Sequence, residues 1–313
     1  MSLLRHAVSL LATIGSVKLL GIVLAVQVAI GLTLVALVAT DNVPFVDDGE
    51  ADRRPARTTA APTVNRFDGA AAFRLLRRQV EFGPRPAGSP ESRRLARLLK
   101  RIVPRGRFQE VPGGLRNVIG TVRGREPGYV VVGAHYDTKD IPGFVGANDG
   151  ASGTAVVAQI ARTIRRPRHT IQFIFFDGEE APRGVPDRQF ERYGLRGSKV
   201  AAPVFKDARA MVLLDFVGDK NLALRREQYS DRALWRRLRE AARRVGVIST
   251  FPSTTQGAVL DDHVPFIGEG VPSIDLIDFD FPCFHRTCDN MSVVSRRSVD
   301  AVGETVYELL RGL

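Results

Sequence analysis

The sequence predicts an α/β protein: a single domain whose mostly parallel, mixed β-sheet is flanked by helices, preceded by one transmembrane helix. Two observations lead to this expectation. From residue 67 onward, short and nearly continuous apolar segments alternate with segments of helical periodicity, which is the pattern of a mostly parallel sheet buried on both faces. Nearer the N-terminus, one uncharged apolar segment is long enough to cross a lipid bilayer.

The apolar segment at residues 19–40 contains no charged side chain. At a rise of about 1.5 Å per residue, it covers the roughly 30 Å hydrocarbon core of a bilayer. A cleaved signal peptide would have a shorter apolar stretch and a small residue where Leu37 stands. Arg5 and Lys18 precede the segment and acidic residues follow it. Because basic residues favour the cytoplasmic side, we expect residues 1–18 in the cytoplasm, a single-pass anchor in the cell membrane, and the rest outside the cytoplasm.

Residues 41–66 lack hydrophobic periodicity and are rich in Pro, Ala, Thr, Asp and Arg, so we expect a flexible linker there. The remaining residues, 67–313, have a length that fits one α/β domain. The apolar runs predict strands at residues 117–122, 129–133, 170–176, 210–214 and 272–277. The helical patterns predict helices at residues 91–102, 153–163, 231–245 and 298–310.

The net charge of +11 comes mostly from arginine. Such a charge can indicate a nucleic-acid partner. However, the arginines are scattered in pairs such as Arg77-Arg78 and Arg243-Arg244, and the sequence contains no recognisable nucleic-acid-binding module. We therefore expect no nucleic-acid partner and interpret the charge as a solvated surface, or one attracted to anionic lipid.

Acidic and histidine residues gather where the expected strands end. They are His135 and Asp137, Asp149 in a glycine-rich turn, Glu179 and Glu180, Asp215, and His285. In sheets of this kind, ligands bind beyond the carboxyl ends of the strands. Adjacent carboxylates such as those of Glu179 and Glu180 repel each other, and a bound cation would relieve this repulsion.

Charge balance is consistent with one or two zinc ions. Two Zn²⁺ ions are neutralised by Asp149, Asp215, Glu180 and a bridging hydroxide, with His135 and His285 as neutral ligands. A single Zn²⁺ is neutralised by Asp149 and Glu180, with His285 as the third ligand and a fourth position open for substrate, as in catalytic zinc sites. Mixed nitrogen and oxygen ligands without thiolate suit zinc.

Six motifs carry a family resemblance. HYD, NDGASG, FFDGEE, LLD, DDHVPF and FHRTCDN occur in this order, and the series resembles the M28 family of zinc peptidases over residues 67–313. The segments IFFDGEEA, LDDHVPF and GVPSIDLI are similar to the glutaminyl-peptide cyclotransferase branch of that family. The resemblance implies the zinc-aminopeptidase fold, of the phosphorylase/hydrolase type, and peptide or protein N-termini as substrates.

The resemblance also implies a role for each metal ligand. His135 and Asp215 match the ligands of one metal, while Glu180 and His285 match those of the other. Asp149 matches the carboxylate that bridges the two.

Further roles follow from the same resemblance. Glu179 matches the general acid and base, and Asp137 matches the residue that orients the imidazole of His135. Asp262 and His263 resemble a supporting pair beside the substrate, with Asp262 taken as a second catalytic residue.

Two cysteines, Cys283 and Cys288, bracket His285. Outside the cytoplasm they could form a disulfide that stiffens the loop of this ligand. Two free thiols and a pair of metal thiolates are the alternatives.

Three functions are compatible with these residues. The first is a zinc-dependent M28 aminopeptidase, in which Glu179 activates a metal-bound water; the second is a glutaminyl-peptide cyclotransferase, which forms pyroglutamate and releases ammonia. The third is a non-catalytic ectodomain, which the intact ligand set disfavours. The cyclases usually carry tryptophans after the Glu-Glu pair and before the last histidine, whereas this chain has Phe284 at the second place and its one tryptophan at Trp235. From the sequence, hydrolysis is therefore placed slightly ahead.

Overall fold

The computed structural model describes residues 59–313. The predicted cytoplasmic segment 1–18, the predicted anchor 19–40 and the first part of the predicted linker lie outside the described residues. Along residues 59–313, no helix is both long and apolar enough to cross a bilayer.

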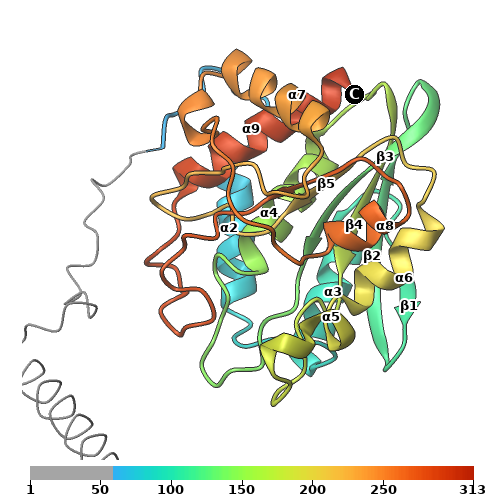
Figure 1. Cartoon of the computed structure of the whole chain (residues 1–313), viewed down its shortest axis with the longest axis vertical. Coiled ribbons are helices and arrows are strands. Elements are labelled where there is room, and N and C mark those ends of the chain that lie inside the picture. Colours follow the sequence, from blue (N-terminus) through green and yellow to red (C-terminus); the bar gives the residue numbers. More distant parts are fainter. Residues whose placement is uncertain (1–58) are drawn as a thin grey trace, which may run out of the picture. The chain divides into compact units, whose positions relative to one another are not determined.

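One mixed sheet of six strands forms the centre of the domain (Figure 1). The strands are β1 (Arg107–Val111), β2 (Leu115–Val122), β3 (Glu126–His135), β4 (His169–Phe176), β5 (Met211–Leu214) and β6 (Ser273–Leu276). Their order in the sheet is β1-β2-β4-β3-β5-β6. Strands β4, β3, β5 and β6 are parallel, whereas β1 and β2 are antiparallel at one edge. The predicted mostly parallel, mixed sheet is confirmed.

Helices cover both faces of this sheet (Figure 1). The larger core includes side chains of α2 (Gly69–Val80), α3 (Pro90–Ile102), α4 (Ala151–Thr163), α7 (Arg232–Arg244) and α9 (Arg296–Gly312). The smaller core, on the other face, includes side chains of α6 (Arg196–Val204) and α8 (His263–Gly268). Successive residues of a strand point to opposite faces: Val130 and Val132 lie in the larger core and Val131 in the smaller. A short helix, α5 (Phe190–Tyr193), lies in the loop after β4.

Most of the elements absent from the sequence prediction have weak local signals. β1 is an edge strand whose side chains are mostly exposed or half-buried, so it shows no apolar run. α8 has six residues and α6 contains Pro203, and short or proline-containing helices give little periodicity. The exception is α2, a regular amphipathic helix capped by Asp68, which was not predicted although its periodicity is clear.

The end of the predicted linker lies against the domain. The hydroxyl groups of Thr59 and Ser298 are 3.1 Å apart, and the backbone N–H of Thr63 donates to Val245 O at 3.0 Å. The packed chain therefore begins earlier than residue 67, the boundary that hydrophobic periodicity indicated.

Helix α4 lies unusually close to β5 at Gly153. A Cβ atom on this residue would be 2.0 Å from the carbonyl oxygen of Leu214, so only glycine allows this approach. We expect Gly153→Ala to destabilise the protein by about 1–3 kcal/mol, as overpacking in a rigid core does. Denaturant unfolding would measure the effect. Gly268→Ala is the matched control, because a Cβ there has no atom within 4 Å; equal losses in the two variants would contradict the packing argument.

Candidate active site

The predicted site residues lie at the carboxyl ends of the parallel strands. His135 is the last residue of β3, and Asp215 follows β5 directly. Glu179 and Glu180 lie on the turn after β4, and Asp149 lies just before α4. Because β3, β4 and β5 run in the same direction, their ends meet at one edge of the sheet, where open α/β sheets bind ligands.

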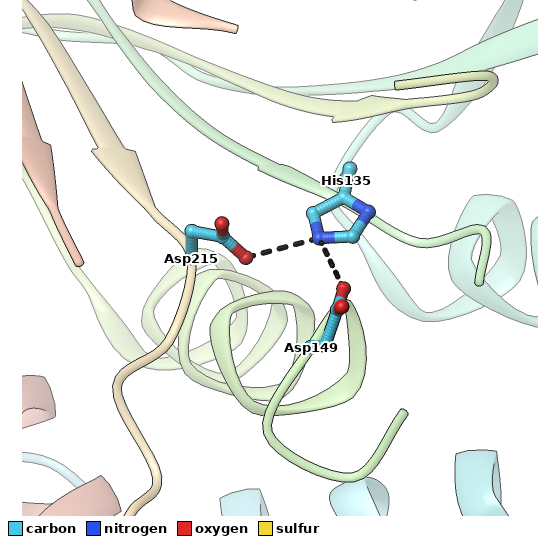
Figure 2. A group of neighbouring side chains, drawn as sticks. All are labelled: His135, Asp149 and Asp215. Atoms are coloured by element: carbon cyan, nitrogen blue, oxygen red, sulfur yellow. Dashed lines mark hydrogen bonds and ion pairs between the residues drawn. The ribbon is translucent and has the colours of Figure 1, made fainter. Parts of the chain in front are cut away.

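One group of possible metal ligands consists of His135, Asp149 and Asp215 (Figure 2). The Nε2 atom of His135 lies 3.0 Å from Asp215 Oδ1 and 3.3 Å from Asp149 Oδ1. All three side chains are buried. The structure thus brings together the two residues predicted for one metal and the predicted bridging carboxylate.

A second group consists of Asp149, Glu180 and His285. The Nε2 atom of His285 lies 3.0 Å from Glu180 Oε1 and 3.6 Å from Asp149 Oδ2. Asp149 belongs to both groups, with one oxygen towards each histidine. This is the placement expected of a bridging carboxylate.

The residues present fit a divalent metal. Each group offers one imidazole nitrogen and two carboxylate oxygens, and the ligand atoms of each group lie within 4.8 Å of one another. Asp149 Oδ2 is buried and has no hydrogen-bond partner, a costly state for a carboxylate unless a cation is bound there. Mixed nitrogen and oxygen donors of this kind suit zinc.

Electrostatics distinguish the two adjacent glutamates. Burial, reinforced by the negative charge of Glu180, raises the pKa of Glu179 well above its usual value. Burial also tends to raise the pKa of Glu180, but the hydrogen bond and charge of His285 outweigh it and lower that pKa. Glu180 is therefore the glutamate suited to hold a metal, and Glu179 the one suited to carry a proton.

Asp137 supports the glutamate turn more directly than it supports His135. Its Oδ1 and Oδ2 atoms accept hydrogen bonds from the backbone N–H groups of Glu179 and Glu180, at 3.3 and 3.2 Å. The distance from Asp137 Oδ1 to His135 Nδ1 is longer, 3.8 Å. Asp137 therefore fixes the turn that carries both glutamates and also lies beside the imidazole that it was predicted to orient.

Three supporting residues were not singled out from the sequence. Asp289 accepts hydrogen bonds from the backbone N–H groups of Asn148 and Asp149, at 2.7 and 3.0 Å, and burial together with the charge of Asp149 raises its pKa to about 7. Lys139 Nζ lies 3.1 Å from Glu180 Oε2. Arg85, fully buried, donates to the carbonyl oxygens of residues 145 and 146 in the turn before Asp149. Asp289 lies inside the segment FHRTCDN, which resembles the family, and that position was the available signal for it.

A cavity of about 320 Å³ opens onto the second metal group. Its wall includes Glu179 and also Asp261, whereas the predicted catalytic residue Asp262 is fully buried and does not line it. In the structure it is therefore Asp261, and not Asp262, that faces the cavity. His263 is also fully buried; its ring contacts Glu227 and Asp275 and forms no ion pair with the metal groups above.

Three phenylalanines form one side of this cavity, which we call the aromatic wall: Phe216, Phe279 and Phe284. The ring centroids of Phe279 and Phe284 are 5.0 Å apart, and those of Phe216 and Phe284 are 5.6 Å apart. Phe284 also stacks on His285, with centroids 3.9 Å apart. Phe284, at a place where related cyclases usually have tryptophan, therefore provides an aromatic surface beside the metal group. Trp235 is buried in α7, in the larger core.

Cys283 and Cys288 form a disulfide that closes the loop carrying His285. His285 itself has a positive φ of 50°, a backbone conformation that non-glycine residues seldom adopt without support. We expect simultaneous replacement of both cysteines by serine to weaken zinc binding about tenfold, because the ligand loses support from its surroundings. Competition with a chromophoric chelator would measure the affinity. Ser292→Ala, an exposed change in the same segment, is the control; unchanged affinity in the cysteine variant would argue against this role.

Comparison with known proteins decides the family. The sequence profile of Peptidase family M28 matches residues 117–310. The chain belongs to peptidase family M28. All seven predicted metal-ligand, acid-base and orienting residues of the M28 site, from His135 to His285, lie in the matched range.

Named relatives carry two activities. The glutaminyl-peptide cyclotransferase of Bos taurus is 29% identical over 238 residues, which are 62% of this chain and 65% of that protein. Aminopeptidase YwaD of Bacillus subtilis is 29% identical over 221 residues, 63% of this chain and 45% of that protein. The M28 chain thus spans less than two thirds of the length of either relative.

The solved structures that resemble this chain likewise include an aminopeptidase and a glutaminyl cyclase by name. A leucine aminopeptidase precursor from Bacteroides thetaiotaomicron superposes with a TM-score of 0.72 at 28% identity. A glutaminyl cyclase from Porphyromonas gingivalis superposes with a TM-score of 0.70 at 30% identity. Each match covers 80% of this chain and 99% of the other.

Proposed function

We propose that this M28 protein is a zinc-dependent glutaminyl-peptide cyclotransferase, which converts an N-terminal glutamine into pyroglutamate and releases ammonia. The names of the relatives favour this activity, because cyclotransferases and cyclases are frequent among them. This order reverses the preference for hydrolysis drawn from the sequence.

The observation that carries the proposal is the cavity. At about 320 Å³ it lies at the small end of ligand sites, a size suited to one terminal residue rather than to an extended peptide. The aromatic wall can pack against the methylene groups of a glutamine side chain. It also limits the water that could compete with the substrate's own amine.

The residues around the cavity can perform the cyclisation. A zinc ion held by Asp149, Glu180 and His285 would polarise the carbonyl of the side-chain amide. Glu179 accepts a proton from the α-amine as its nitrogen bonds to the amide carbon, and returns a proton to the departing nitrogen, which leaves as ammonia. The raised pKa of Glu179 suits this transfer in both directions. Asp261, which also faces the cavity, can accept a hydrogen bond from the amine.

Aminopeptidase activity is the second candidate, and one observation favours it. Asp149 belongs to both groups of possible ligands, so these residues could hold two metal ions, which would activate a water for hydrolysis. Under this alternative, Glu179 takes a proton from water and passes it to the leaving amine.

Parallel assays separate these functions. The purified chain, loaded with zinc, would be given an N-terminal glutaminyl amide and a panel of aminoacyl amides. Ammonia and pyroglutamate from glutamine alone, lost on chelation, would support the cyclase. Chelator-sensitive release of several amino acids would establish the aminopeptidase instead. Inactivity on both substrates with zinc bound would favour a non-catalytic domain.

The location of the protein is a further proposal, which rests on the sequence of residues 1–50 alone. We propose a single-pass anchor at residues 19–40, with the M28 domain outside the cytoplasm. A protease added to intact cells would reach the domain in that case, and protection of the domain from the protease would contradict it.

A further inference from the structure

A third group of buried side chains lies beside the catalytic cavity, and two of its three members, His263 and Asp275, have no role in the proposed chemistry. Asp261, His263 and Asp275 place ligand atoms within 4.8 Å of one another. His263 begins α8, and Asp275 lies in the middle of β6. All three are at most 3% exposed. A carboxylate that is fully buried on a strand is costly and needs a compensating partner.

One ring nitrogen of His263 is already bound. Its Nε2 atom lies 3.2 Å from Glu227 Oε2. Glu227 is fully buried and also accepts hydrogen bonds from the backbone N–H groups of Tyr229, Ser230 and Val259. A carboxylate with this many donors stays ionised and accepts a hydrogen bond from the imidazole, so His263 carries its proton on Nε2. The lone pair of Nδ1 is then free.

The free nitrogen lies near oxygens of two carboxylates that also lack hydrogen-bond partners. His263 Nδ1 lies 3.9 Å from Asp275 Oδ2. His263 Nδ1, both oxygens of Asp275 and Oδ2 of Asp261 are buried and without a hydrogen-bond partner. Within residues 59–313, no ion pair joins Asp261 or Asp275 to an arginine or lysine. A nitrogen lone pair, both oxygens of Asp275 and one oxygen of Asp261 thus lie together, and none of these atoms has a hydrogen-bond partner.

We propose that Asp261, His263 and Asp275 bind a divalent cation, separate from any ion at Asp149. One imidazole nitrogen with two carboxylates is a donor set that Zn²⁺ and Mn²⁺ accept. Donor atoms within 4.8 Å of one another can surround an ion at ordinary ligand distances of about 2.0–2.2 Å with a small contraction. The contact of Glu227 with the far nitrogen matches the carboxylate–histidine–metal arrangement that orients ligands in metal sites.

The position of Asp261 connects this ion to the cavity. Asp261 lines the catalytic cavity and also belongs to the third group. A cation held there keeps the Asp261 carboxylate ionised and fixes its direction. Asp261 therefore binds the proposed ion and also lines the substrate cavity.

Metal counting tests this site without any activity assay. The purified chain and its variants would be stripped of metal, reloaded with zinc or with manganese, desalted, and analysed by elemental mass spectrometry. We expect Asp275→Asn and His263→Gln each to bind about one ion per chain fewer than the parent protein does, because a neutral amide is a poor ligand. Asp278→Asn is the matched control: Asp278 is a buried aspartate just after β6, its Oδ2 accepts from Ala223 N–H, and the ion count should not change.

The same count in an Asp149→Asn variant separates this site from the catalytic one. Asp149→Asn should lose catalytic metal and still retain one ion, which disappears when His263→Gln is added. Circular dichroism would show whether Asp275→Asn and His263→Gln fold. If both fold and bind as many ions as the parent protein, whether loaded with zinc or with manganese, the site does not exist. In that case Asp261 and Asp275 share a proton instead. Should Asp275→Asn fail to fold, the His263→Gln count decides alone.

Discussion

Glu179→Gln is expected to reduce turnover by about 10²–10⁴-fold, the usual contribution of a positioned acid or base, and to leave the zinc content unchanged. Glu179 lines the cavity but belongs to neither group of metal ligands at Asp149. Its burial beside Glu180 raises its pKa, so the side chain holds a proton more readily than an ordinary glutamate does. Glutamine has the same shape and cannot transfer that proton.

The measurement is kcat on the better substrate, together with zinc content and thermal stability. Glu269→Gln, the same chemical change at an exposed position after α8, should behave like the parent. A Glu179→Gln variant that keeps most of its turnover would contradict the assigned role. A variant that loses zinc along with activity would place Glu179 among the ligands instead.

Asp149→Asn is expected to reduce activity to background and to remove the catalytic metal. Asp149 is the one residue shared by both groups, and its two oxygens face the two histidines. Asparagine offers a single neutral oxygen, so both groups lose charge and a ligand at once. Elemental analysis after desalting measures the effect directly.

Asp215→Asn tells how many catalytic ions are used. Asp215 belongs only to the group with His135. If one ion at Asp149, Glu180 and His285 suffices, as we propose for a cyclase, Asp215→Asn should retain that ion and measurable activity. If both groups hold metal, as in the aminopeptidase alternative, this variant should lose one of two ions. Retention of full zinc and activity by Asp149→Asn would contradict the whole assignment.

The motif order predicted most of the metal site, because each ligand follows a strand of a parallel sheet. His135, Asp215 and the pair Glu179-Glu180 come at or just after the ends of β3, β5 and β4, and the carboxyl ends of parallel strands meet at one edge. The apolar runs that predict these strands are local in the sequence. For that reason, a site built from strand ends can be predicted from the sequence.

Residues on loops could not be assigned in the same way. Of the adjacent pair Asp261 and Asp262, the sequence favoured Asp262, but Asp261 faces the cavity. Neighbouring side chains in an irregular segment point in different directions, and only the packing of α8 on the sheet decides which of them faces the cavity. Asp289 and Lys139 similarly act through contacts made across 141 and 41 positions of the chain, which no local pattern reveals.

The sequence by itself determined the fold class and the family, and it predicted the candidate metal ligands, because these depend on local periodicity and on motifs at strand ends. Only the tertiary structure decided that Asp149 is shared by two groups, that a disulfide closes the His285 loop, and that Phe284 completes an aromatic wall. It also brought His263 from α8 against Asp275 of β6. These contacts join segments that are separate in the chain, and folding the sheet and its helices is what sets the distances between them.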